Sequence, residues 1–443
     1  MGALKKHTIA RPRMHKVVHL RPGEEDAEAD SDSSSSADPS SSSDSLILLD
    51  ESTCAPGTPV AALPAAVGRA LSASSSARLV THRLVLGYDD LSAEEALSRL
   101  LPADVTVPTG FELAGTIAHL NLRPEHAPHK TRIARVLLDK LPQVRTVVNK
   151  VGETGGPHRT FEMEVLAGEG EGAGPDAPLE TSARENGLTF RMDFRAVYWN
   201  SRLGTERARL VRSFAADDVV LDLCCGVGPI ALLAARKVRA VYANDLNPRA
   251  VRYLELNERA NFLRGPTSTG RIAGESDGGE DEGREDRRAR GLLAGTTCMD
   301  ARLCVAARVG AVNARFGGGA ERARSNPESG GGDSAAGGGD DPAPLRFTQA
   351  VMNLPGGSVA LLDAFVGAFD ERAWPRETLP RIHAYAFSKD EDPEEDVARR
   401  VAEALGARAE GTTFRRVRMV APGKYMMLAS FPLPPEAAYR RQK

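Results

Sequence analysis

Two glycines and one acidic residue in the middle of the chain have the types and the spacing of a nucleotide-binding site. Gly226 and Gly228 follow an apolar run, and Asp245 comes nineteen residues after Gly226. Glycines in such a position let the backbone turn tightly and come close to a ligand. A carboxylate at the end of the following strand can accept hydrogen bonds from both hydroxyls of a ribose. The pattern therefore predicts that this stretch binds an adenosine-containing ligand.

The glycine spacing alone leaves other interpretations open. Gly226-x-Gly228-x-x-Ala231 also fits the dinucleotide pattern of nicotinamide and flavin enzymes, and a glycine turn can have no ligand at all. Two further features favour a methyltransferase that uses S-adenosylmethionine. They are Asp222, inside the strand before the glycines, and the loop Asn353-Leu354-Pro355 after another apolar strand.

A parallel sheet is needed to bring these residues together. Val219–Leu223 is typical of a buried parallel strand, Ile230–Ala235 of a short helix and Ala240–Ala243 of a second strand. Thr297–Arg302 stands at the end of a third strand, and Phe347–Asn353 is predicted as the fourth. The order of strand, glycine loop, helix, strand and acid predicts the opening of a doubly wound nucleotide-binding sheet.

The remaining part of the chain continues this alternation and then changes it. We expect a helix over Val359–Phe369, a fifth strand over Ile382–Phe387 and a helix over Glu394–Leu405. Thr413–Val420 and Lys424–Phe431 are predicted to form an antiparallel pair at the end.

Composition limits the class of protein. A chain of 443 residues has material for two or three domains, and a net charge of −3 excludes no class of partner. Five cysteines without a Cys-x-x-Cys pair favour neither a zinc site nor a disulfide framework, so we expect no metal and a reducing compartment. No run approaches eighteen apolar residues, so we expect no membrane partner. We also expect a monomer.

The first residues allow two interpretations. Met1–Pro22 is basic and contains no acid, as in a mitochondrial transit peptide. It is also compatible with the first strand of a small domain, which Ser45–Asp50 resumes after a serine-rich insert, and we favour this interpretation. The expected location is the cytoplasm or the nucleus, with a possible mitochondrial matrix pool.

Three segments have compositions that cannot bury enough apolar surface to fold, and we expect disordered loops there: about 30–44, about 266–292 and about 316–344. A different segment, Arg123–Lys150, carries seven Lys and Arg residues against two acids. We interpret it as a surface that contacts nucleic-acid phosphates.

The sequence resembles the archaeal and eukaryotic tRNA (guanine-37 N1)-methyltransferases. The matching pieces, in chain order, are HLNLRPEH, TVVNKVGE, RTFEMEVLAGE, VYWNSRLGTERARLV, GVGPIALLAA, DLNP and VMNLPGGS. The resemblance implies an α/β fold: a Rossmann-like class I methyltransferase domain, a preceding α+β middle domain and a small N-terminal domain that contacts tRNA. We place these domains at residues 201–435, 84–200 and 1–83.

The resemblance also assigns roles to residues. It implies that Glu206 takes the proton of guanine N1, that Arg159 contacts O6 and that Arg202 completes the catalytic set, with tRNA containing G37 as the partner. The cofactor, S-adenosyl-L-methionine, is expected at Arg207, Asp222, Gly226, Gly228, Asp245, Leu246, Asp300, Ala301, Asn353 and Pro355. One departure is Cys224-Cys225, where the family usually has an aromatic residue and alanine.

Chemistry gives these assignments a reason. Guanine N1 accepts a methyl group only if its proton leaves, and a carboxylate such as Glu206 can take that proton. A guanidinium at Arg159 stabilises the charge that develops on O6. The alternative for Arg202 and Glu206 is a surface ion pair, worth about 0.2–0.5 kcal/mol at their spacing of four residues.

Three other functions stay open at this point. The nearest is transfer of the aminocarboxypropyl group during wybutosine synthesis, which uses the same cofactor and the same tRNA position. The second is an RNA-binding module without activity, and the third is a nicotinamide dehydrogenase. The fourth residue of Asn353-Leu-Pro-Gly is not aromatic, which favours a ring nitrogen over an exocyclic amine as the methyl acceptor.

Overall fold

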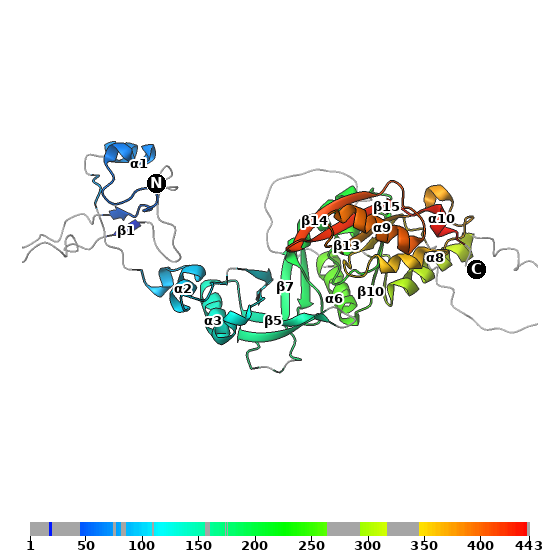
Figure 1. The fold of residues 1–443 in the computed structure, drawn as a ribbon, viewed down its shortest axis with the longest axis horizontal. Coiled ribbons are helices and arrows are strands. Elements are labelled where there is room, and N and C mark those ends of the chain that lie inside the picture. The colour runs from blue at the N-terminus through cyan, green and yellow to red at the C-terminus, as the bar shows by residue number, and fades with distance from the viewer. Residues whose placement is uncertain are drawn as a thin grey trace, which may run out of the picture. The chain divides into compact units, whose positions relative to one another are not determined.

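The computed structural model describes most of the chain, as two compact units (Figure 1). The described residues are 17–19, 45–73, 77–80, 86–108, 110–155, 160–172, 174, 176–263, 293–316 and 345–440. The first unit comprises Met1–Gly110 and Leu122–Pro142, and the second comprises Phe111–Asn121 and Gln143–Lys443. The three segments expected to be disordered lie outside the described residues, except Phe316. The predicted domain boundaries at residues 83 and 200 stay a prediction.

A short antiparallel pair and three helices make up the first unit. Strand β1 (Val17–His19) pairs with β2 (Ser45–Ile47), which confirms that the residues on both sides of the serine-rich segment belong to one small sheet. The second strand ends at Ile47, earlier than predicted. The helices are α1 (Ala65–Ser72), α2 (Ala93–Leu100) and α3 (Lys130–Lys140).

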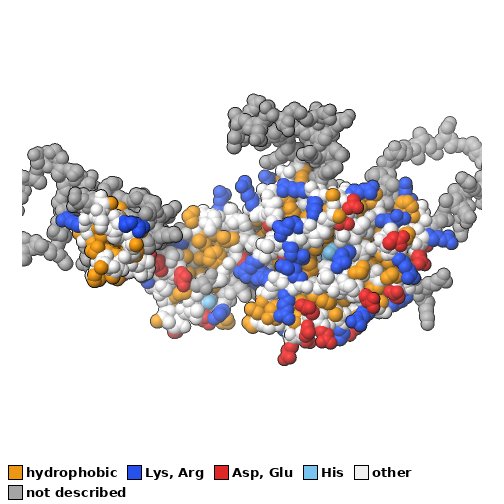
Figure 2. All heavy atoms as spheres, turned by 90° about the horizontal axis from the view of Figure 1, so that it is seen from above, with side chains coloured by type: hydrophobic (Ala, Val, Ile, Leu, Met, Phe, Trp, Pro, Cys, Tyr) orange, Lys and Arg blue, Asp and Glu red, His pale blue; other side chains and the backbone are white. Residues whose placement is uncertain are grey.

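The basic segment Arg123–Lys150 is divided between the units: five of its cations belong to the first and two to the second. Two of them serve the unit's own structure. Arg132 Nη1 donates to the Leu100 carbonyl at 3.0 Å, and Lys140 Nζ lies 3.9 Å from the centre of the Tyr88 ring. A phosphate-contacting surface on the other cations stays a prediction. Figure 2 shows further Lys and Arg side chains gathered near the middle of the second unit.

The second unit contains three sheets. The four-stranded sheet has the order β3 (Phe111–Ala114), β4 (Ile117–Leu120), β5 (Thr146–Gly155) and β6 (Thr160–Gly168). Strands β7 (Glu180–Glu185) and β8 (Leu188–Asp193) form an antiparallel pair. The seven-stranded sheet has the order β11 (Gly295–Cys298), β10 (Ala240–Asp245), β9 (Val219–Asp222), β12 (Gln349–Met352), β13 (Arg381–Ser388), β15 (Lys424–Pro432) and β14 (Thr413–Ala421).

This large sheet confirms the predicted doubly wound architecture. Its first five strands are parallel, and β15 and β14 add an antiparallel pair at the edge. The helices are α4 (Gly204–Ser213), α5 (Ala231–Ala235), α6 (Pro248–Glu258), α8 (Ala301–Phe316), α9 (Pro393–Leu405) and α10 (Pro435–Ala438). No helix within the described ranges has the length and apolar character needed to cross a bilayer.

Alternating side chains of the strands build a core on each side of the sheet. Val220 of β9 packs with residues of α4, α5 and α6, whereas Val219 and Leu221 pack with residues of α8 and α9. Helices therefore cover both faces, which explains why the strand sequences are continuous apolar runs.

The helix predicted over Val359–Phe369 is present but shorter than predicted. The structure has a 3-10 helix at Ala360–Phe365. Arg302 Nη2 donates to the Ala360 carbonyl at 2.9 Å, so a side chain occupies an acceptor that an α-helix would use. Gly367 then adopts φ +68° and ends the segment.

Two asparagines attach strand β8 to α6 and to the turn that follows this helix. The Asn257 side chain, at the end of α6, accepts from the Arg191 backbone N–H at 2.8 Å and donates to its carbonyl at 3.1 Å. Asn261 makes the same pair of bonds to Thr189 at 2.9 Å each. Helical residues four apart thus bond to alternate residues of β8, so that side-chain amides replace a neighbouring strand.

We predict that Asn257→Ala lowers the free energy of unfolding by about 1–3 kcal/mol, because it leaves backbone groups of Arg191 without partners. Urea denaturation of the full chain measures this loss. Glu255→Ala, an exposed change on the same helix, is the matched control and should alter stability by less than about 0.5 kcal/mol. Equal effects of the two substitutions would contradict the role of Asn257.

Candidate active site

The glycine loop between β9 and α5 is bonded to the end of β10. Gly226 adopts φ +55°, and its N–H donates to Asp245 Oδ2 at 2.8 Å. Asp245 Oδ1 accepts from the Asn247 N–H, also at 2.8 Å. Apart from Gly226 and its two chain neighbours, no atom of the described residues lies within 4 Å of the position that a Cβ would take at Gly226. The loop therefore leaves space beside the Asp245 carboxylate, as a ligand-binding loop requires.

Gly228 has a different function in the same loop. It adopts φ +94°, and a Cβ there would lie 2.4 Å from Leu254 Cδ1. This glycine lets the loop pack closely against α6, so its requirement is structural.

The Asp222 carboxylate, at the end of β9, is buried without a partner. The residue is 1% exposed, and neither carboxylate oxygen has a hydrogen-bond partner within the described part of the chain. Burial and then the negative charge of Asp245 raise the pKa of Asp222 to about 7. The backbone N–H groups of Cys224 and Ala231, and the Arg207 guanidinium, oppose this rise without completing a hydrogen bond to it.

Asn244 holds the ends of three neighbouring strands together. It is fully buried, and its Nδ2 donates to the carbonyls of Leu223 at 3.2 Å and Met299 at 3.0 Å. Its Oδ1 accepts from Thr297 Oγ1 at 2.8 Å. The polar residues that follow β9, β10 and β11 consequently share one edge of the sheet.

Two of the predicted cofactor residues differ in exposure at this edge. Leu246, directly after Asp245, is 45% exposed, which is unusual for a large apolar side chain and suits the face of a planar ring. Asp300 begins α8, where its Oδ1 accepts from the Arg302 N–H at 2.8 Å, and Ala301 is buried against the sheet.

The loop after β12 carries Asn353 and Pro355 and is fixed by Ser358. Ser358 Oγ donates to the Met352 carbonyl at 2.7 Å and accepts from the Leu354 N–H at 3.1 Å. Ser358 is fully buried, and its substitution would leave these backbone groups without partners.

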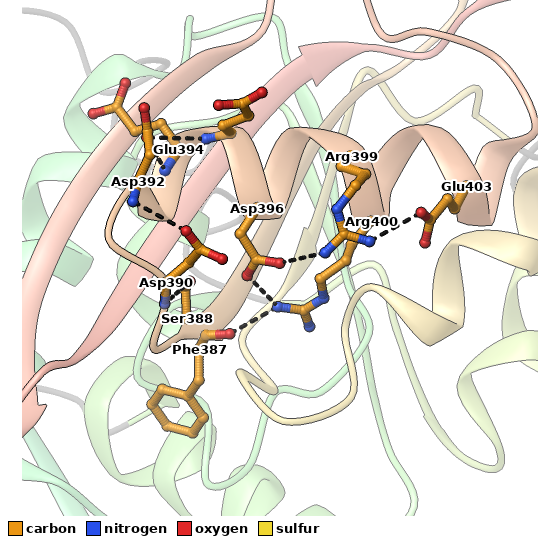
Figure 3. A network of polar contacts seen from close by, with 10 residues as sticks. Phe387, Ser388, Asp390, Asp392, Glu394, Asp396, Arg399, Arg400 and Glu403 are labelled. Carbon is orange, nitrogen blue, oxygen red and sulfur yellow. Dashed lines mark hydrogen bonds and ion pairs between the residues drawn. The ribbon is translucent and has the colours of Figure 1, made fainter.

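The same loop is anchored to β13 and α9 through Phe387. The Phe387 N–H donates to the Pro355 carbonyl at 3.0 Å. Its own carbonyl accepts from Arg400 Nη1 at 2.8 Å, and the same nitrogen lies 3.2 Å from Asp396 Oδ2 (Figure 3). Asp392 accepts from the Glu394 N–H at 3.1 Å and caps this helix. A chain of polar contacts thus supports the Asn353–Pro355 loop.

Glu206 lies on α4, against the face of the sheet next to β13 and β14. It is 7% exposed, and its carboxylate accepts two bonds from Arg209, to Oε1 at 2.7 Å and to Oε2 at 2.8 Å. Arg415 Nε donates to Oε2 at 3.0 Å, and the Tyr385 hydroxyl donates to Oε1 at 3.4 Å. Burial and the Glu206 charge both raise the pKa of Tyr385, so this phenol stays protonated.

The alternative interpretation, a surface ion pair between Arg202 and Glu206, is wrong. Arg202 Nε instead contacts Glu112 Oε1 of β3 at 2.9 Å. Arg202 belongs to a 3-10 turn over Ser201–Leu203, and α4 begins only at Gly204. The two residues therefore do not share one regular helix, and the spacing of four does not place their side chains together.

Arg207 is a buried cation with one ion pair. It is 3% exposed, and its Nη1 lies 2.7 Å from Glu185 Oε2. Its guanidinium carbon lies 5.2 Å from the centre of the Trp199 ring, and its Nε has no hydrogen-bond partner among the described residues. This free donor is compatible with the predicted cofactor contact.

The predicted catalytic Arg159 lies outside the described residues, so its role stays a prediction. Sequence reasoning did not identify Arg209, Tyr385 or Arg415 as partners of Glu206. The spacing of Glu206 and Arg209, three apart on one helix, could have indicated the first. No local pattern indicates the other two, because they come from distant strands.

The fold and the site together define a class of protein. A parallel sheet with a glycine loop after its first strand, an acid after its second and a polar loop after its fourth forms the Rossmann-like domain of class I methyltransferases. Within the described ranges, no three His, Cys, Asp or Glu side chains are grouped so that they could hold a metal ion.

Comparisons with known proteins narrow this class. Residues 93–172 match the family described as "TYW2 N-terminal domain", and residues 181–286 match "TRM5/TYW2 methyltransferase domain". The tRNA (guanine(37)-N(1))-methyltransferase of Danio rerio is 32% identical over 99% of this chain and 77% of its own length. That of Schizosaccharomyces pombe is 37% identical over 80% and 76%. The chain belongs to the family of tRNA (guanine(37)-N(1))-methyltransferases.

Two further comparisons concern length and fold. The chain spans 56% of a Vitis vinifera relative named tRNA (guanine(37)-N(1))-methyltransferase 1, to which it is 39% identical over 89% of its own length. It spans 60% of an Arabidopsis thaliana relative named tRNA (guanine(37)-N(1))-methyltransferase 2. A solved structure, "The complex structure of aTrm5 and tRNALeu", aligns with a TM-score of 0.52 over 80% of each chain at 19% identity, which shows a common fold.

We predict that Asp222→Asn stabilises the ligand-free protein. Because the folded-state pKa of about 7 lies above the ordinary value of 3.8, ionising Asp222 costs stability as the pH rises between these values. Removing the charge should raise the free energy of unfolding at pH 8 by about 1–3 kcal/mol, after allowance for burying the amide. Urea denaturation at a series of pH values measures this gain, which should shrink from pH 7 toward pH 4.

Asp218→Asn is the matched control on the same segment. Asp218 is also buried, but it accepts bonds from Ala215 N–H at 2.7 Å and Thr348 Oγ1 at 2.6 Å. Loss of its charge should lower stability. A loss of stability at both positions would show that the Asp222 carboxylate is not under strain.

Proposed function

We propose that this chain methylates N1 of guanosine-37 in tRNA with S-adenosylmethionine as the methyl donor. The observation that carries the proposal is the buried Glu206 carboxylate, which is bonded to Tyr385 of β13 and Arg415 of β14 on one face of the large sheet. The relatives that share its family bear the name of this activity. A carboxylate in such a place is suited to proton transfer rather than to solvation of the surface.

The residues at the carboxyl edge fit the donor. Asp222 is a buried carboxylate without a hydrogen-bond partner among the described residues, and an ammonium or sulfonium cation would supply the missing charge. We assign ribose binding to Asp245, contact with the adenine ring to Leu246 and the loop that faces the donor to Gly226. Asp300, Ala301, Asn353, Pro355 and Arg207 complete the proposed donor site. S-adenosylmethionine supplies a methyl group on a sulfonium, which leaves as a neutral thioether.

The chain's own residues then have to remove a proton. Glu206 takes the hydrogen of guanine N1, so that the ring nitrogen can form its new bond to carbon without retaining a positive charge. The negative charge that moves toward O6 requires a fixed donor, a role that we keep for Arg159 as a proposal. Arg202, bonded to Glu112, is assigned to positioning of the segment before α4. The proton on Glu206 returns to solvent after the product leaves.

The discriminating experiment is an assay with tRNA transcripts that carry G37 or A37, followed by mass analysis of the nucleosides. The proposal expects a gain of one methyl group on guanosine-37 and none on the A37 transcript. A gain of an aminocarboxypropyl group would support the alternative reaction. Binding of both ligands without any modified nucleoside would support an inactive RNA-binding module.

We predict that Glu206→Gln slows single-turnover methylation by about 10²–10⁴-fold, because the amide keeps the size of the side chain but cannot take a proton. Affinity for tRNA and donor should change little, and higher pH should partly restore the rate as N1 ionises by itself. Quench-flow measurement at saturating ligands tests this. A rate within a factor of about two of the parent, with both ligands bound, would remove Glu206 from the mechanism.

We predict that Asp245→Ala weakens S-adenosylmethionine binding by about 1.5–3 kcal/mol, the contribution of charge-assisted hydrogen bonds to the ribose. Isothermal titration calorimetry measures the change. Glu255→Ala, remote from the edge, serves as the control and should leave the affinity unchanged. If Asp245→Ala also retains the parent affinity, the assignment of the ribose site is incorrect.

A further inference from the structure

The Glu206 carboxylate has no vacant acceptor site in this structure. A carboxylate offers about four lone-pair positions for hydrogen bonds, two on each oxygen. Here Oε1 accepts from Arg209 and Tyr385, and Oε2 accepts from Arg209 and Arg415. These three residues are the charged and titratable groups that bond to Glu206 from α4, β13 and β14. A carboxylate that already accepts four hydrogen bonds can receive the guanine proton only after one of these donors moves away.

The three partners differ in their freedom to leave. Arg209 lies on the same helix and binds both oxygens, while Tyr385 is 1% exposed within the core. Arg415 makes one bond, and its side chain is 53% exposed on β14, the edge strand of the sheet. Arg415 is therefore the partner that can exchange with the least disturbance.

The register of the edge strands defines where Arg415 can move. Tyr385, Leu428 and Arg415 lie opposite one another on three neighbouring strands and share one face of the sheet. The next row on that face consists of Phe387, Met426 and Arg418. Phe387 bonds to the Pro355 carbonyl, so Arg418 lies in the row that leads to the Asn353–Pro355 loop.

A bulge is responsible for this second row. The register shifts between Arg416 and Arg418, which turns Arg418 to the same face as Arg415. Arg416 pairs opposite Met427 and belongs to the other face, where its guanidinium carbon lies 5.3 Å from the centre of the Tyr425 ring. Arg418 forms no ion pair with any described residue.

We propose that Arg415 and Arg418 form a phosphate-binding row on β14, and that Arg415 leaves Glu206 for a backbone phosphate when the RNA substrate binds. The inference rests on the proposed function, since it requires Glu206 to be the base and RNA to be the substrate. Two guanidiniums in adjacent rows suit the phosphates of an RNA chain.

The exchange couples substrate binding to the chemistry. Without RNA, Arg415 fills one position on Oε2 and keeps the base occupied. With RNA, the phosphate neutralises Arg415, Oε2 gains a vacant position, and Arg209 still fixes the orientation of the carboxylate. Glu206 therefore becomes a free acceptor only when its substrate is in place.

The test compares Arg415→Gln with Arg416→Gln, a matched control that removes the same charge from the next residue on the opposite face. We expect Arg415→Gln to raise the tRNA Kd by about 3–30-fold and to lower the slope of log K against log salt by about one. The single-turnover rate at saturating tRNA should stay within about threefold of the parent, because Arg415 has already left Glu206 in the complex. Arg416→Gln should leave both quantities near the parent values.

The pH dependence separates exchange from a fixed structural contact. The profile of kcat/KM reports the free enzyme and that of kcat reports the complex. Arg415→Gln should move the acid limb of kcat/KM to higher pH and leave that of kcat in place. Arg415→Lys should recover part of the affinity, since lysine still contacts phosphate as a point charge.

Two results would overturn the inference. One is a saturated rate that falls more than tenfold in Arg415→Gln with an unchanged tRNA Kd, since Arg415 would then hold Glu206 throughout the reaction. The other is an equal loss of affinity in Arg416→Gln. The parent protein is measured in parallel, and if it transfers no methyl group to G37, the proposed function fails rather than the exchange.

Discussion

The burial of Asp222 without a partner is the constraint on which the arrangement of the site depends. Strand β9 lies between β10 and β12 and is covered by helices on both faces, so its last residue is removed from water. A carboxylate in this position is held near its neutral form by burial and by Asp245. The N–H groups of Cys224 and Ala231 and the Arg207 guanidinium oppose this rise in part, and a bound cation would oppose it further. The glycine loop leaves open space at Gly226, whose N–H bonds to Asp245.

Glu206 differs from Asp222 in the hydrogen bonds that its carboxylate accepts. Its carboxylate is also buried, but all its acceptor positions are occupied by two guanidiniums and a phenol. Among the described residues, the Asp222 carboxylate has no hydrogen-bond partner, whereas the Glu206 carboxylate accepts four hydrogen bonds. The proposed reaction changes both, since a cationic donor satisfies Asp222 and a polyanionic substrate withdraws one cation from Glu206. Without donor and substrate, Asp222 therefore lacks its cation and Glu206 lacks a vacant acceptor position.

The sequence predicts the parts of this architecture that depend on short-range patterns. Apolar runs, the glycine loop and the acid nineteen residues later place β9, α5 and β10 correctly, since each is determined within one supersecondary unit. The expectation that Arg202 and Glu206 share one helix face is wrong, because Arg202 lies in a short 3-10 turn and α4 begins only at Gly204. The contact of Arg415 with Glu206 joins residues 209 positions apart and depends on the sheet order, which no local pattern contains.

The edge strand β14 shows why the direction of side chains could not be predicted from the sequence either. Strict alternation along β14 would place Arg416 and Arg418 on one face and Arg415 on the other. The bulge adds one residue to this strand opposite β15, and from that point the alternation is reversed. Arg418 consequently shares a face with Arg415, which contacts Glu206, and the two arginines stand in adjacent rows of that face. Bulges at sheet edges re-aim side chains at some cost in regular pairing, and here the result is a doubled positive charge on the face that carries the proposed base.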